Sequence, residues 1–113
     1  MPRDRDYLLD VLQAAKLALD YVRGRTRDEF LRDVQFQDAV IRRLEIIGEA
    51  VRRISQEARA SHPDLPWHEM VSMRNLLIHN YDDVDFEIVW DTVQRDLPKL
   101  VSAIERILPA EEK

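Results

Sequence analysis

Apolar residues recur every three to four positions through most of this chain, and that spacing restricts what it can fold into. A helix places such residues on one face, whereas a strand needs alternation, which is sparse here. Only two glycines, Gly24 and Gly48, occur among the 113 residues. The sequence therefore predicts an all-α protein, and its length suits a single domain, residues 1–113, with a modest core.

Helix start and stop signals divide this pattern into five segments, which we expect to pack as an antiparallel up-and-down bundle. The segments cover about residues 4–23, a short stretch that begins at the capping-box sequence Thr26-Arg27-Asp28-Glu29, about residues 34–59, about residues 66–78, and a last stretch that follows Asp82, Asp83 and Asp85.

Three residues refine this prediction. Gly24 suits the left-handed position that ends the first helix. Gly48 in mid-helix costs about 1 kcal/mol relative to alanine, so we expect another helix to approach closely there. Pro98 lies inside the last segment and should kink or split that helix.

Composition excludes several classes of protein. Cysteine is absent, so disulfides and thiolate metal sites are excluded. The N-terminus has no apolar signal segment and no apolar run approaches membrane-spanning length, so we expect a cytoplasmic protein that does not enter a membrane. The net charge is −5, and the excess acid lies in the second half. Any contact with RNA must therefore be local or assembled by oligomerisation.

The run from Arg74 to Tyr81 carries the most distinctive chemistry. Arg74 supplies a permanent cation suited to a phosphate, and His79 supplies a proton-transfer group that works near neutral pH. Asn75 and His79 lie one helical turn apart on a polar stripe. Tyr81 adds a phenol two residues further on.

Arg74 needs an explanation because it falls in the middle of an apolar stripe of the predicted fourth helix. The stripe consists of Trp67, Met70, Val71, Leu77, Ile78 and Tyr81. One interpretation is structural: a carboxylate from another helix, Glu45 or Glu49, neutralises the guanidinium. The other is functional: Arg74 lies at the floor of a cleft and is available to a phosphate. Both can hold if the carboxylate orients the guanidinium.

His79 and Tyr81 also have structural interpretations. A lone histidine at a helix end is often a cap or a solvated residue, and Tyr81 alone suits a core aromatic position. On an ideal helix Arg74 and His79 point roughly 140° apart, so a single chain converges poorly on one phosphate. A two-fold homodimer would bring each group near its symmetry mate, and the geometry favours that arrangement.

The pattern Arg74-x4-His79-x-Tyr81 resembles the signature of the HepT-like branch of the HEPN superfamily. The likeness extends over essentially the whole chain. It includes Gly24 to Phe30, Arg43 to Ala50, Pro66 to Asn75, Asp85 to Trp90 and Asp96 to Pro98.

This resemblance implies a homodimeric helical bundle that acts as a metal-independent endoribonuclease, the toxin of a type II toxin-antitoxin system. Arg74 and His79 would be catalytic, with Asn75 in support. The implied partner is an MntA-type nucleotidyltransferase antitoxin, which would use ATP and Mg to transfer AMP onto Tyr81. The protein itself would need no cofactor and no metal.

Such a mechanism agrees with the chemistry of the residues. RNA carries its own nucleophile, the 2′-hydroxyl. His79 fits the general acid or base and Arg74 the cation that stabilises charge developing on phosphorus. AMP on Tyr81 would add bulk and negative charge that repel RNA.

Two other functions compete with this one. The protein could be a non-catalytic helical module that binds a nucleotidyltransferase partner. A zinc enzyme is more distant: His68-Glu69-Met70-Val71-Ser72 begins like a His-Glu-x-x-His zinc helix, but Ser72 replaces the second ligand.

Overall fold

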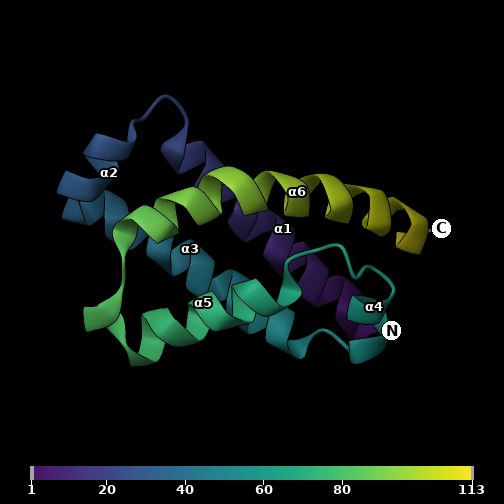
Figure 1. Cartoon of the computed structure of the whole chain (residues 1–113). Coiled ribbons are helices and arrows are strands. Elements are labelled where there is room, and N and C mark those ends of the chain that lie inside the picture. Colours follow the sequence, from purple (N-terminus) through teal and green to yellow (C-terminus); the bar gives the residue numbers. More distant parts are fainter. Residues whose placement is uncertain (1, 113) are drawn as a thin grey trace.

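Four long helices alternate in direction along the chain, and Figure 1 shows this up-and-down course in the computed structural model. The structure describes residues 2–112, with side chains for residues 3–108. Every regular element in this range is helical, so the predicted all-α class is confirmed. The elements are α1 (Pro2–Val22), α2 (Arg27–Arg32), α3 (Val34–Arg53), α4 (Gln56–Ala60), α5 (Trp67–His79), the 3-10 helix η1 (Tyr81–Asp83) and α6 (Phe86–Glu112).

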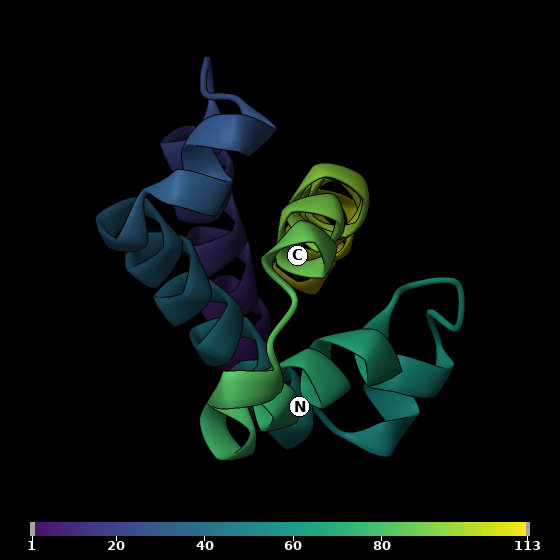
Figure 2. The same cartoon turned by 60° about the vertical axis from the view of Figure 1, so that its left-hand side comes forward.

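Helices α1 and α3 pack against each other, and each carries one further long helix. α6 packs on α1 and α5 packs on α3, an arrangement that Figure 2 shows from a second side. Burying one large aliphatic side chain contributes roughly 1.5–3 kcal/mol, so this shared core stabilises the whole bundle. Its almost wholly buried residues include Val11, Ala15, Val40, Leu44, Ile47, Val93, Leu97 and Leu100.

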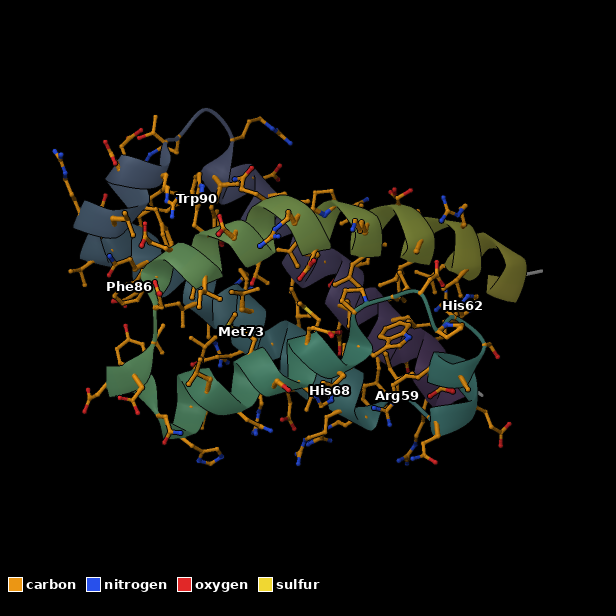
Figure 3. All side chains as sticks on the ribbon, in the orientation of Figure 1. Arg59, His62, His68, Met73, Phe86 and Trp90 are labelled. Atoms are coloured by element: carbon orange, nitrogen blue, oxygen red, sulfur yellow. The ribbon has the colours of Figure 1, made fainter. Side chains whose placement is uncertain are left out.

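The short helix α2 is fixed by its cap and by aromatic contacts. Thr26 and Glu29 form the predicted capping box, in which each backbone N–H donates to the other side chain, at 3.0 and 3.2 Å. Phe30 is fully buried, with its ring centroid 5.2 Å from that of Phe36 and 5.5 Å from that of Trp90. Figure 3 shows Trp90 on the stretch of α6 that faces α2. These rings close one end of the bundle.

The prediction of one helix over residues 34–59 is wrong, because α3 ends at Arg53. Ser55 is extended and caps the separate helix α4 by accepting a hydrogen bond from the backbone N–H of Ala58 at 3.1 Å. The backbone N–H and the hydroxyl of Ser55 donate to the two carboxylate oxygens of Asp4 on α1, at 2.9 and 2.7 Å. A helical Ser55 would give its N–H to α3 instead, so the contact with Asp4 favours the break.

The acidic segment before α6 is divided between two elements. Asp82 and Asp83 lie in η1, whereas Asp85 stands just ahead of α6. The Asp85 carboxylate accepts a hydrogen bond from the backbone N–H of Glu87 at 2.9 Å. Of the three aspartates expected at this helix start, Asp85 is therefore the one that caps it.

Helix α6 continues without a break through Pro98, so the predicted split there is wrong. Pro98 is exposed, and so is Gln94, whose carbonyl loses its helical partner because proline has no N–H. Water can bond that carbonyl on the solvent side. Leu97 and Leu100 are fully buried on the opposite side and hold both halves of the helix on α1.

Two expectations about the whole chain remain. The predicted single domain includes Met1 and Lys113, which lie outside the described residues. Within the described range, no helix combines the length and apolar character needed to cross a lipid bilayer.

Candidate functional site

Helices α3 and α5 approach each other at Gly48 more closely than a side chain would permit. A Cβ atom at this position would lie 2.2 Å from the Cβ of Arg74 and 2.7 Å from the carbonyl oxygen of Met70. Optimal contact between carbon atoms needs about 3.5 Å or more. The predicted close approach is confirmed, and it sets the base of the Arg74 side chain directly against α3.

Two contacts orient the Arg74 guanidinium, whose side chain is 17% exposed. Nη2 lies 3.1 Å from Oε2 of Glu49 on α3, an ion pair outside hydrogen-bond geometry, and Nη1 donates to Oδ1 of Asn75 at 2.9 Å. The structural interpretation, with Glu49 as the partner, is thus confirmed. Both contacts fix the plane of the guanidinium, so Arg74 is held rather than free to rotate.

Glu49 remains charged in this setting. Hydrogen bonds from Arg52 and Arg53, together with the charges of Arg52 and Arg74, outweigh burial and hold the pKa of the Glu49 carboxyl below its ordinary value. One negative charge thus faces three positive ones at the end of α3. This junction of α3 and α5 is locally basic in a chain of net charge −5.

The buried face of α5 differs in part from the predicted stripe. Met73 is buried, whereas Ile78 and Tyr81 are each 44% exposed. The interpretation of Tyr81 as a core aromatic is therefore wrong. The core face is centred on Met70, Met73 and Leu77, and Figure 3 labels Met73 on this helix. Arg74 consequently lies at the edge of the core rather than at its centre.

Arg74 and His79 border one shallow depression of about 580 Å³ that opens to solvent. Although an ideal helix would point them apart, both side chains reach this hollow within a single chain. None of the residues that line it is acidic, although the Glu49 carboxylate lies behind it in contact with both lining arginines. The lining residues are Arg52, Ser72, Arg74, Asn75, Leu76, His79 and Asn80.

This lining suits a phosphate. Guanidinium, imidazole, amide and hydroxyl groups are hydrogen-bond donors to phosphate oxygens. Residues 11–107 match the family described as Ribonuclease HepT-like. The chain belongs to this family. The resemblance carried by the motif is thereby confirmed over most of the sequence.

Named relatives agree with the HepT-like assignment. "Probable ribonuclease HepT" of Thermococcus cleftensis is 43% identical over 103 residues, which cover 91% of this chain and 94% of that protein. "Putative RNase TTE0752" of Caldanaerobacter subterraneus is 37% identical over 112 residues, 99% of this chain and 100% of that protein. "Gamma-glutamylcyclotransferase and putative RNase MJ0434" of Methanocaldococcus jannaschii is 39% identical over 107 residues, 95% of this chain but 48% of that protein. No solved structure matches significantly.

The described part of this HepT-like chain contains no cluster of metal ligands of the kind that a zinc enzyme needs. His68, which Figure 3 labels on α5, is exposed, with its Nε2 atom 3.4 Å from the hydroxyl of Ser72. Among the side chains of residues 3–108, no three histidines, aspartates or glutamates gather in a way that would hold a metal ion.

Sequence reasoning missed the contribution of α3 to the depression. Arg52 comes from the last turn of α3, whereas the recognised motif lies entirely on α5 and the turn after it. A signal was present in its spacing, since Arg52 lies one helical turn beyond Gly48 and Glu49. A residue one turn from a close helix crossing, on the same face, lies beside the partner helix.

Proposed function

We propose that this HepT-like protein is a metal-independent endoribonuclease in which Arg74 and His79 act on one phosphodiester. The observation that carries the proposal is their shared depression, which no acidic residue lines. Membership of the Ribonuclease HepT-like family and the names of its relatives support it. The local basic charge at the junction of α3 and α5 offers RNA a docking point on an otherwise acidic protein.

The chemistry follows from the groups present. The 2′-oxygen attacks the adjacent phosphorus while the bond from phosphorus to the 5′-oxygen breaks, which leaves a 2′,3′-cyclic phosphate and a 5′-hydroxyl. His79 takes the proton from the 2′-hydroxyl or supplies one to the departing 5′-oxygen, and water carries out the other proton transfer. Arg74 stabilises the negative charge that develops on the phosphoryl oxygens. Asn75 supports this role through its hydrogen bond to the guanidinium.

A cleavage assay with EDTA present tests this mechanism. We expect the wild-type protein to cut single-stranded RNA, and the His79→Ala and Arg74→Ala variants to lose that activity. His68→Ala is the matched control, because His68 is an exposed histidine of the same helix that does not line the depression. Undiminished cleavage by His79→Ala, or dependence of the wild type on added metal, would refute the mechanism.

The proposal includes a homodimer that encloses the site. One chain leaves the depression open to solvent, and Ile78 and Tyr81 expose apolar surface close to it in the sequence. A second copy packed two-fold against α5 would cover that surface and supply the missing wall. Light scattering should give twice the chain mass for the wild type and a lower mass for Ile78→Glu. A fully active monomer would contradict this part of the proposal.

The proposed biological role is that of a toxin neutralised by AMP on Tyr81. The exposed phenol follows directly after Asn80, which lines the depression, so AMP attached there would bring negative charge to its rim. The proposed donor is an MntA-type nucleotidyltransferase that uses ATP and Mg. Co-expression should add the mass of AMP to the peptide that carries Tyr81 and should leave the Tyr81→Phe variant unmodified.

A growth assay separates this role from that of a non-catalytic binding module. A nuclease toxin should arrest growth when expressed alone, and the arrest should disappear in Arg74→Ala and His79→Ala. A module without activity would leave growth unchanged in every variant. Full neutralisation by the partner with Tyr81 unmodified would exclude the AMP mechanism.

A further inference from the structure

Arg52 has a position that the proposed catalytic pair leaves unexplained. It stands on the last turn of α3, its side chain is 52% exposed, and it lines the same depression as Arg74 and His79. Arg52 and Arg74 come from different helices, yet one carboxylate joins them. Arg52 Nη2 lies 3.1 Å from Oε1 of Glu49, and Arg74 Nη2 lies 3.1 Å from Oε2.

The direction of the helices orders these groups along the depression. α3 and α5 run antiparallel, and Gly48 faces Met70 and Arg74. Arg52, one turn further along α3, therefore lies toward the start of α5, whereas His79 ends that helix. Arg74 stands between Arg52 and His79 in this order. A strand whose reacting phosphate lies at Arg74 and His79 would thus pass Arg52 at one side.

We infer that Arg52 binds a second phosphate of the RNA, next to the one that is cut. A guanidinium carries five N–H donors, more than the contact with Glu49 takes up, and its planar fork suits a phosphate. Glu49 holds Arg52 at the rim and so restricts the freedom that an exposed arginine would otherwise have to lose on binding. The inference rests on the proposed ribonuclease function and makes the substrate a polymer rather than a mononucleotide.

Arg53 provides a matched control within the same cluster. It also contacts Oε1 of Glu49, at 3.0 Å through Nη2, and its side chain is 55% exposed, close to the value for Arg52. Arg53 does not line the depression, however. It borders a second groove of about 430 Å³ on the side of α1, together with Tyr7 and Asp10, and Arg74 lies between this groove and the depression because it lines both. Substitution of either arginine removes one partner of Glu49, but only substitution of Arg52 removes a side chain that would contact the RNA.

Salt-dependent RNA binding distinguishes the two arginines. The probe is a fluorescently labelled single-stranded RNA of 12 nucleotides, titrated with the His79→Ala protein so that it stays uncut. The logarithm of the binding constant falls linearly with the logarithm of salt concentration, by about 0.7 for each phosphate neutralised on a single strand. We expect the additional Arg52→Ala change to reduce this slope by about 0.7, and Arg52→Lys to restore it. The additional Arg53→Ala change should leave the slope as it was.

The slopes of these variants show whether Arg52 contacts the RNA. An unchanged slope in Arg52→Ala, or an equal reduction in Arg53→Ala, overturns the inference, because the effect would then be absent or would come through Glu49. Arg52→Gln, which keeps the length of the side chain, replaces Arg52→Ala if the latter does not fold. If wild-type cleavage depends on Arg74 and His79 while the slope stays unchanged, only the role of Arg52 fails. If the wild type does not cut RNA and the His79→Ala protein does not bind it, the proposed function fails as well.

Discussion

Glu49 of α3 and Arg74 of α5 form an ion pair of 3.1 Å that joins the two helices beside the candidate site. The carboxylate is charged because hydrogen bonds from Arg52 and Arg53 and the neighbouring positive charges lower its pKa. A side chain whose pKa is lowered by folding stabilises the fold while it is ionised. The pair therefore links the geometry of the site to the stability of the protein.

Low pH should reduce the free energy of unfolding of the wild type more than that of a variant that lacks the Glu49 carboxylate. The pKa of Glu49 is lower in the folded chain than its ordinary value of 4.5. Its stabilising contribution is therefore fully present above pH 4.5 and is lost as the pH falls through the depressed value. Urea midpoints measured from about pH 6 to about pH 3 should fall more steeply for the wild type than for Glu49→Gln. Parallel pH curves would show that the Glu49 carboxylate, with its contacts to Arg52, Arg53 and Arg74, contributes nothing to stability.

Gly48→Ala should destabilise the protein although alanine is the better helix former. The new Cβ would overlap the side chain of Arg74 and the backbone of Met70, and overpacking of this kind costs about 1–3 kcal/mol. Ala39→Gly is the control, because Ala39 is exposed on α3. This change measures the difference in helix propensity alone, about 1 kcal/mol in favour of alanine. Thermal unfolding of both variants tests the sign. A Gly48→Ala protein more stable than the wild type would mean that α5 moves away at little cost.

Asn75→Ala should reduce RNA cleavage without unfolding the protein. Asn75 is exposed, and its carbonyl oxygen accepts the hydrogen bond that orients Nη1 of Arg74. Misplacement of a catalytic group by about 1 Å can cost up to about 10²-fold in rate. We expect a loss in kcat up to that size, measured against Gln94→Ala, an exposed amide variant on α6. Equal activity in both variants would remove Asn75 from the mechanism.

Thr26→Ala should loosen α2 and the aromatic cluster behind it. The change removes the hydroxyl that accepts the backbone N–H of Glu29, and the loss of such a cap costs about 1 kcal/mol. In a protein of this size the melting temperature should fall by about 4 °C. Thr92→Ala, in the second turn of α6, removes a hydroxyl that donates to the carbonyl of Ile88 within an already formed helix, so its effect should stay within about 0.5 kcal/mol.

Local signals predicted much of this fold correctly. The capping box at Thr26 and Glu29 and the turn at Gly24 each depend on residues close together in the chain, and both are present. The close approach at Gly48 could be predicted as well, and the partner of Arg74 could be restricted to Glu45 or Glu49, of which the structure shows Glu49. A buried cation needs a carboxylate from a neighbouring helix, and a helical glycine indicates where that neighbour lies.

The errors arose where distant residues decide the outcome. Ile54 and Ala58 continue the apolar spacing of α3, so nothing local shows that Asp4 captures Ser55, 51 positions away, and ends the helix. Pro98 carries the same local penalty in any sequence, but here it faces solvent between two buried leucines. Arg52 joins the site from another helix, which a motif confined to one segment cannot report.

The contact between Asp4 and Ser55 also bears on how the protein is prepared. It ties the first turn of α1 to the segment just beyond Arg52. A recombinant chain that starts after Asp4, or that a protease trims there, lacks the acceptor for both groups of Ser55. We expect the end of α3 to fray in such a chain, even though every residue of the depression is present. The residue at which an expressed chain starts therefore affects how well ordered the end of α3 is, although that part of the surface is encoded near the middle of the gene.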